Sequence, residues 1–348
     1  MSKNTQTLDQ EAVGTYLRDH LPGFDSDFEV QKFETGQSNP TFLLKTVAGN
    51  YVLRRKPPGV LLKSAHAVDR EFRVQKALAD TEVPVARMHL LCEDDSVIGS
   101  AFYIMDHVAG RNFTDPVMGD TDPATRGAVI DDMNRVLAAL HDVDVDAVGL
   151  SDYGPPGNYF ERQLGRWTKQ YKASETRTIP EMNELMKSLE EQMPADDGQR
   201  GLVHGDYRID NMIFSADEPR CLAVLDWELC TLGDPLADFS YHLMNWVMPP
   251  GDSSRGSIMA LDDLEAWGIP SMDEYVDMYC KHTGRDGLPE LDDYFAYNGF
   301  RLAGILQGII GRVRDGTANS ANAESNAARV VPLAQFAAEY ARRAGMPG

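Results

Sequence analysis

This sequence has few cysteines, and it lacks the residue spacings of common metal sites. Its four cysteines lie far apart with no CxxC pair, and its eight histidines include no HExxH motif. A zinc site or a disulfide framework needs such clustered spacing, so both are disfavoured. We expect the cysteines to be buried thiols in a reducing, cytoplasmic environment.

Long apolar runs and a basic surplus are also missing. No stretch approaches the roughly 20 apolar residues of a membrane span, and the polar residues 1–10 do not resemble a signal peptide. The 33 basic residues are outnumbered by 54 acidic ones, for a net charge of -21. Nucleic-acid binding needs a clustered basic surface, so we expect neither a membrane nor a nucleic acid as partner. An acidic surplus would favour a cationic substrate only if it were concentrated at a pocket.

One polar stretch, residues 202–211, organises what is present. Asp206 and Asn211 flank a short loop there, and an apolar run at 212–214 follows it. A turn and a second apolar run at 221–225 then lead to Asp226. Two short apolar runs joined by a turn predict a hairpin, which would bring Asp226 back beside Asn211.

These residue types suit phosphoryl transfer. Magnesium prefers hard oxygen ligands, which Asn211 and Asp226 would supply, while a separate carboxylate, Asp206, would orient or deprotonate the attacking hydroxyl. Glu228 would help to hold a second metal ion or a water molecule, or would act as a hydrogen-bonding brace. The alternative for the whole stretch is a solvated acidic hairpin.

The motif HGDxxxxN at residues 204–211 and the strand end Leu-Asp-x-Glu at 225–228 resemble the aminoglycoside phosphotransferase and choline kinase family of protein-kinase-like enzymes. Residues 36–41, 52–54, 205–208 and 300–305 look closer to the kinase-like domain that is fused to some acyl-CoA dehydrogenases. The resemblance covers roughly residues 10–345. It implies ATP and magnesium as cofactors.

The expected fold class is α+β, with the bilobal architecture of protein kinases. Residues 1–108 would form a nucleotide-binding lobe and hinge, and residues 109–348 a larger, mostly helical lobe with the catalytic loop and acceptor site. Alternating apolar residues predict strands at 28–33 and 41–45, three further strands would complete a five-stranded antiparallel sheet, and helical spacing predicts a helix at 66–79. The five expected strands are 28–33, 41–45, 51–56, 87–92 and 101–105. The main helices expected elsewhere are 9–21, 129–140, 182–193, 294–313 and 321–343, the last kinked or divided at Pro332.

The first lobe would bind the nucleotide. Gly36, Ser38 and Asn39 lie in a loop between two strands that would fold over the phosphates, although the same residues fit an ordinary hairpin. The resemblance places Arg54 where kinases have a phosphate-binding lysine, with Lys56 as the alternative on the same strand face. Glu71 would pair with that cation, and it would otherwise face solvent.

Three further positions follow from the resemblance. The backbone of Asp106 and Val108 would bind adenine at the hinge between the lobes. Arg208, two residues after the expected base, would stabilise the transferring phosphate or an anionic part of the substrate. Asp238, in a GDPxxD turn, would brace the loop by accepting hydrogen bonds from the backbone or from His204.

The leading hypothesis is an enzyme that phosphorylates a hydroxyl group of a small molecule. The missing APE motif of protein kinases disfavours a protein acceptor. A hydroxyacyl-CoA ester or an aminoglycoside is the expected acceptor, although the acidic composition gives no sign of the basic groove that a CoA ester needs. Tyr207, Tyr241 and Trp246 would line the acceptor side or belong to the core. The alternatives are a catalytically silent nucleotide-binding module and a choline-like kinase, and no sequence pattern indicates the oligomeric state.

Overall fold

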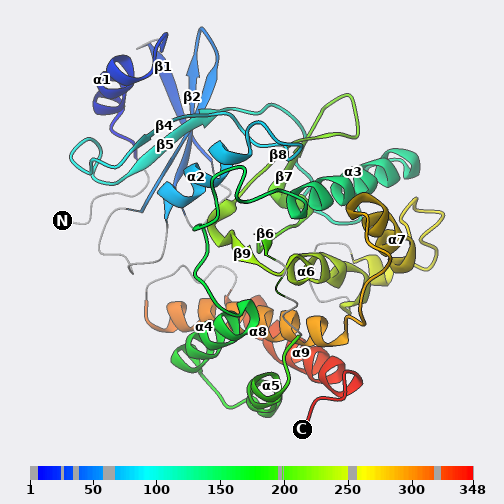
Figure 1. The fold of residues 1–348 in the computed structure, drawn as a ribbon. Helices are drawn as coiled ribbons and strands as arrows, with labels where there is room; N and C mark the ends of the chain where they lie inside the picture. The colour runs from blue at the N-terminus through cyan, green and yellow to red at the C-terminus, as the bar shows by residue number, and fades with distance from the viewer. Residues whose placement is uncertain are drawn as a thin grey trace. The chain divides into compact units, whose positions relative to one another are not determined.

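We describe the fold from a computed structural model. The described residues are 7–24, 27–33, 39–57, 67–194, 198, 200–249, 257–316 and 323–347. The chain forms two compact units (Figure 1). The first contains residues 1–112, 146–150 and 211–230, and the second contains residues 113–145, 151–210 and 231–348.

A five-stranded antiparallel sheet forms the centre of the first unit, in the order β1-β2-β3-β5-β4. The sequence prediction of this sheet is confirmed. Its strands are β1 (Phe28–Lys32), β2 (Thr41–Thr46), β3 (Asn50–Arg55), β4 (Met88–Cys92) and β5 (Phe102–Asp106). The helices of this unit are α1 (Gln10–His20) and α2 (Val68–Leu78), drawn in dark blue and light blue in Figure 1.

The two faces of the sheet have different partners, because side chains alternate along a strand. Leu53 of β3 belongs to the apolar cluster that includes Val13 and Leu17 of α1. Its neighbour Arg54 stands opposite Tyr103 of β5, which belongs to the second cluster. The strand period thus turns one basic side chain of β3 away from the α1 cluster.

The predicted hairpin also belongs to the first unit. Strands β7 (Met212–Phe214) and β8 (Cys221–Val224) pair in antiparallel fashion, with an irregularity at Phe214. The backbone N–H of Leu225 then donates to the carbonyl oxygen of Asn211 at 2.8 Å. Leu225 is therefore bonded to Asn211 at the end of the hairpin, and Asp226 directly follows Leu225 in the chain.

The second unit is mainly helical. Its helices are α3 (Pro123–His141), α4 (Tyr159–Ser174), α5 (Pro180–Glu191), α6 (Pro235–Val247), α7 (Met272–Thr283), α8 (Asp292–Arg314) and α9 (Ala323–Arg343). Glycines let α8 approach its neighbours closely. A Cβ at Gly299 would lie 2.8 Å from the Cβ of Ala337 in α9, and one at Gly311 would lie 2.5 Å from the Cβ of Ser174 in α4.

Several details of this unit differ from expectation. Helix α9 continues through Pro332, so of the two alternatives expected there, a kink or a division, the division is wrong. The GDPxxD segment is no isolated turn, since Asp234 caps helix α6 and Pro235 begins it, which are favoured residues at these positions. Strands β6 (Gly201–Val203) and β9 (Thr231–Gly233) form an additional pair, and β6 ends directly before His204.

The cysteines and the apolar character of the helices bear on two expectations drawn from composition. All four cysteines are buried free thiols. Among the helices of the described ranges, none combines the length and the apolar character that crossing a bilayer requires.

Candidate active site

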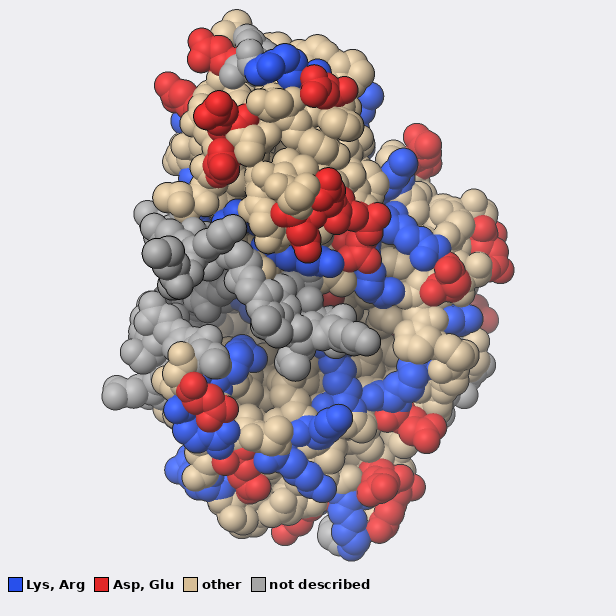
Figure 2. Space-filling model, turned by 90° about the vertical axis from the view of Figure 1, so that its left-hand side faces the viewer, with Lys and Arg blue, Asp and Glu red and all other residues tan. Residues whose placement is uncertain are grey.

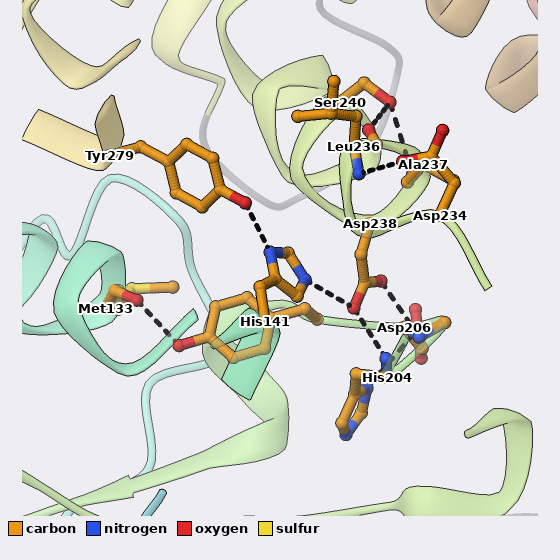
Figure 3. Close-up of polar contacts among 12 residues, drawn as sticks. Met133, His141, His204, Asp206, Asp234, Leu236, Ala237, Asp238, Ser240 and Tyr279 are labelled. Carbon is orange, nitrogen blue, oxygen red and sulfur yellow. Dashed lines mark hydrogen bonds and ion pairs between the residues drawn. The ribbon is translucent and has the colours of Figure 1, made fainter. Parts of the chain in front are cut away.

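The loop after β6 is held from behind by one carboxylate. In the second unit, Asp238 accepts two backbone hydrogen bonds, from the N–H of His204 to Oδ2 at 2.6 Å and from the N–H of Gly205 to Oδ1 at 2.9 Å (Figure 3). Gly205 has φ +83°, a left-handed conformation that favours glycine. Asp238 is 1% exposed, so both of its oxygens hold the loop within the protein.

Asp238 has a third buried neighbour. The Nε2 of His141 lies 3.6 Å from Oδ2 of Asp238, and Nδ1 of His141 lies 2.7 Å from the hydroxyl of Tyr279 (Figure 3). Burial favours the neutral acid, but His141 and the backbone bonds to the loop lower the pKa of Asp238 below its ordinary value. Burial lowers the pKa of His141. Asp238 therefore remains an ionised acceptor for the loop.

Asp206 follows His204 and Gly205 in this loop. It is half-buried, and its backbone N–H donates to Nδ1 of His204 at 3.2 Å. Its Oδ1 accepts a hydrogen bond of 2.6 Å from the hydroxyl of Tyr241 in α6. The two other aromatic residues considered for the acceptor side are core residues, since Tyr207 donates to the carbonyl of Met133 and Trp246 is buried.

Arg208 is paired with a neighbouring carboxylate. Its Nε and Nη2 both donate to the carboxylate of Asp210. Burial alone would lower the pKa of Arg208, but the hydrogen bonds to Asp210 and the charge of Asp206 raise it above the ordinary value. Arg208 is thus a permanent cation two residues from Asp206.

Arg301 is a functional candidate that the sequence analysis missed. This α8 residue is 6% exposed, and its Nη2 donates to the carbonyl oxygen of Gly205. Its guanidinium carbon lies 5.1 Å from the ring centroid of Tyr241. The sequence feature that could have indicated it is a single arginine within the otherwise apolar run of residues 300–306.

In the first unit, Arg54 joins α2 to the end of the hairpin. Its Nε lies 2.8 Å from Oε2 of Glu71, and its Nη2 donates to Oδ1 of Asp226 at 2.6 Å. Burial alone would lower the pKa of Arg54, but Glu71, Tyr103 and Asp226 raise it above the ordinary value. Burial raises the pKa of Glu71, and the charge of Arg54 opposes that change.

Glu71 has two further partners. It accepts hydrogen bonds from the side chains of Asn39 at 2.7 Å and of Tyr103 at 3.0 Å. Asn39 is fully buried, so its amide is part of this network. The alternative cation, Lys56, lies 3.5 Å from Asp69 instead.

Asp226 adopts an unusual backbone conformation. Its φ of 62° and ψ of 59° are left-handed, which costs a residue with a side chain roughly 1 kcal/mol. The next residue, Trp227, is buried and donates from its indole nitrogen to the carbonyl of Val224 at 2.9 Å. That anchor holds the backbone next to Asp226, and Glu228 beyond it is exposed.

The oxygen donors at this corner fit a hard cation. Asn211 and Asp226 supply an amide and a carboxylate oxygen, which are ligand types that magnesium prefers. Across the described part of the chain, no group of three or more His, Cys, Asp or Glu side chains could hold a metal ion. Magnesium commonly takes only one or two carboxylates from the protein, together with waters and substrate phosphates.

The remaining predicted nucleotide residues are placed as follows. Gly36 and Ser38 lie outside the described residues. The backbone N–H of Asp106 donates to the carbonyl of Arg87 at 2.9 Å, and its carboxylate lies 2.6 Å from Nε2 of His89. Val108, two residues farther on, is half-buried.

The sequence matches a family model described as the phosphotransferase enzyme family over residues 29–275. It is 42% identical to acyl-CoA dehydrogenase family member 11 of Rattus norvegicus over 97% of this chain and 44% of that protein. It is 40% identical to acyl-CoA dehydrogenase family member 10 of Mus musculus over 99% of this chain and 32% of that protein. The chain thus spans less than half the length of these curated relatives.

Several solved structures resemble the fold, and two of them show the range of sequence identity. A provisionally assigned aminoglycoside phosphotransferase from Ralstonia eutropha is 49% identical, with a TM-score of 0.86 over 97% of this chain and 99% of that one. A thermostable aminoglycoside phosphotransferase in complex with AMP-PNP and hygromycin B is 16% identical, with a TM-score of 0.60 over 94% of this chain and 98% of that one. The second likeness is one of fold alone.

Proposed function

This chain belongs to the phosphotransferase enzyme family, and from that premise we propose that it transfers the γ-phosphate of ATP to a hydroxyl group of a small molecule. The observation that carries the proposal is the loop ending in Asp206. Asp238 anchors that loop through two backbone hydrogen bonds, so the backbone that leads to Asp206 is held in a fixed position.

In the proposed reaction, Asp206 orients the acceptor hydroxyl and accepts its proton. The hydroxyl oxygen bonds to the γ-phosphorus while the bond from that phosphorus to the departing ADP oxygen breaks. Arg208 stabilises the charge on the transferring group. Because Arg208 is a permanent cation held by Asp210, it needs no change of protonation for this role.

The nucleotide would be held by the first unit. Arg54 is fixed by Glu71 and presents a planar group suited to two phosphate oxygens. Gly36, Ser38 and Asn39 are proposed as nucleotide-binding residues, with Asn39 acting through its hydrogen bond to Glu71. The backbone of Asp106 and Val108 is assigned to adenine.

Magnesium would be held by Asn211 and Asp226, with Glu228 as a further ligand or a hydrogen-bonding brace. Arg54 donates to Oδ1 of Asp226, so one carboxylate would serve both the guanidinium and the cation. When bound, the ion neutralises charge on the nucleotide phosphates. The pairing of Asp226 with Arg54 would hold the magnesium ion and the phosphate-binding guanidinium at a fixed position relative to each other.

Charge on α4 bears on the identity of the acceptor. This helix carries Arg162, Arg166, Lys169 and Lys172 but only one carboxylate, Glu161. Arg162, Arg166 and Lys169 recur at intervals of four and three residues, so they share one face. Helix α4 lies on the side of Figure 1 that faces the viewer in Figure 2, where Lys and Arg side chains gather.

That basic face lies in the same unit as Asp206. Trp167 of α4 contacts Arg301, which also contacts Tyr241 beside Asp206. An anionic acceptor such as a hydroxyacyl-CoA ester suits this charge better than a polycationic aminoglycoside. The similarity to proteins named as acyl-CoA dehydrogenase family members supports the same choice.

A coupled ADP-release assay tests the proposal. The acceptors would be hydroxyacyl-CoA esters, aminoglycosides and choline, with magnesium and ATP present. We expect acceptor-dependent ADP release, and Asp206→Ala should lower it about 100- to 10,000-fold. Asp217→Ala, which removes an exposed carboxylate of the β7–β8 turn, is the matched control. Slow ATP hydrolysis that is unchanged in Asp206→Ala would instead favour a catalytically silent nucleotide-binding module.

A further inference from the structure

Tyr241 lies directly against the proposed base. Its hydroxyl donates a hydrogen bond of 2.6 Å to Oδ1 of Asp206. Burial and the negative charge of Asp206 raise the pKa of Tyr241 above its ordinary range. A raised pKa keeps the proton on the phenol, which agrees with its place as the donor in the contact with Asp206.

Arg301 supports both sides of this contact. Its guanidinium lies 5.1 Å from the ring centroid of Tyr241 and 5.7 Å from that of Trp167, arrangements in which a cation is attracted to an aromatic ring. Its Nη2 also donates to the carbonyl of Gly205, the residue before Asp206. One buried cation thus fixes the tyrosine ring and the backbone next to the base.

We propose that Tyr241 is a positioning residue, held by Arg301, which fixes one oxygen of the Asp206 carboxylate so that the other receives the proton of the acceptor hydroxyl. This inference rests on the proposed phosphotransfer. The terminal torsion of an aspartate is broad, and a donor bound to one oxygen restricts it. The proton then passes from the acceptor oxygen to Oδ2 as that oxygen bonds to phosphorus and ADP departs.

The same contact has a competing interpretation with the opposite consequence. If the phenol occupied the place of the acceptor hydroxyl, it would compete with the acceptor for Asp206. Removal of the phenol oxygen would then increase turnover. Positioning predicts a decrease, so the sign of one measurement separates the two interpretations.

The test compares Tyr241→Phe with the wild type in the ADP-release assay. Phenylalanine keeps the ring over Arg301 and removes only the donor. We expect kcat to fall about 10- to 100-fold, as for a misplaced catalytic group, while KM for ATP stays within about twofold. Tyr340→Phe in α9, whose ring packs against Phe336 and Phe295, is the matched control and should leave both constants unchanged.

A double variant tests whether Tyr241 acts through Asp206. Groups that act as a unit have non-additive effects. Adding Tyr241→Phe to Asp206→Asn should therefore lower kcat no further than Asp206→Asn does alone. A full additional loss in the double variant would overturn the proposal, as would unchanged or increased kcat in the single variant.

Crystal structures of the wild type and of Tyr241→Phe give a readout that needs no turnover. We expect the Asp206 carboxylate of the variant to rotate or to split between positions while the backbone bonded to Asp238 stays in place. An unmoved, single Asp206 conformer would overturn the inference even if no acceptor were found. A wild type that phosphorylates nothing would count against the proposed function, whereas the crystal structures would still decide whether Tyr241 positions the carboxylate.

Discussion

The guanidinium of Arg54 lies 2.6 Å from the carboxylate of Asp226, 172 positions later in the chain. The same guanidinium contacts Glu71 through its Nε at 2.8 Å. A planar fork can serve two carboxylates at once, which a lysine ammonium does with less directional control. This link between strand β3, helix α2 and the hairpin end gives Arg54 a structural role beside its proposed role in phosphate binding.

We therefore expect Arg54→Met to lower stability and nucleotide affinity together. The change leaves Glu71, which is 1% exposed, without its cation, and breaking a buried ion pair from one side costs about 3 to 5 kcal/mol. The double variant Arg54→Met/Glu71→Gln should be more stable than Arg54→Met, because the unpaired acid is gone. Urea unfolding measures the stabilities, and titration calorimetry with Mg·ADP measures nucleotide affinity.

Lys56→Met is the control that distinguishes the two candidate cations. The side chain of Lys56 is 33% exposed and lies 3.5 Å from Asp69, so its loss should change stability by less than about 1 kcal/mol. We also expect nucleotide affinity to stay near that of the wild type. Weakened nucleotide binding in Lys56→Met, with normal binding in Arg54→Met, would reverse the assignment.

The anchor of the catalytic loop yields a second prediction. Asp238→Asn preserves size but replaces one of the two oxygens that accept the N–H groups of His204 and Gly205. One buried N–H then faces an amide group that cannot accept, at a cost of about 1 to 3 kcal/mol. We expect lower stability in urea and lower kcat. Asp262→Asn, at an exposed position, should have neither effect, and an Asp238→Asn enzyme with full activity would contradict the bracing role.

The five-stranded sheet and the hairpin could be predicted because local patterns encode them. Strand β3 alternates so that Leu53 and Arg54 face different partners, and this period-two signal is readable in sequence. Helix α4 was not predicted, although Phe160, Leu164 and Tyr171 are buried at helical spacing. Arginines and lysines lie between its apolar residues and obscure their helical spacing in the sequence.

The candidate site was predictable only where a motif carried it. Asp206 was singled out by its spacing from His204 and Asn211. The contact of Tyr241 with Asp206 joins residues 35 positions apart, and that of Arg301 with Gly205 joins residues 96 positions apart. No local pattern encodes such pairs, because the packing of α6 and α8 in the second unit brings them together.

A third prediction concerns pH and the buried His242. Burial lowers the pKa of His242 from 6.5 to about 4, and its Nε2 lies 2.9 Å from the hydroxyl of Tyr275. Since the folded pKa is below the unfolded one, the unfolded chain binds more protons and stability falls as pH decreases from about 6.5 to about 4. A pKa shift of this size corresponds to a total loss of about 3 kcal/mol in the free energy of unfolding, reached below the folded pKa. Burial lowers the pKa of His141 as well, which acts in the same direction.

Urea unfolding at pH 7.5, 6 and 5 measures this dependence. Carboxylates also titrate toward the acidic end, so the comparison that isolates the histidine is wild type against His242→Gln. The variant should lose less stability between pH 7.5 and 5 than the wild type does. Identical slopes in the wild type and in His242→Gln would contradict the prediction.

The last prediction tests the charge of the acceptor. Reversal of Arg166 and Lys169, both exposed on α4, should raise KM for an anionic acceptor about tenfold, since each exposed charge contact is worth up to about 1 kcal/mol. The wild-type KM should rise with salt for the same reason. The control Lys76→Glu/Lys281→Glu makes the same change in net charge at exposed sites on α2 and α7. If the reversal instead improved phosphorylation of a cationic aminoglycoside and the control did not, the basic face would be a barrier to the true acceptor.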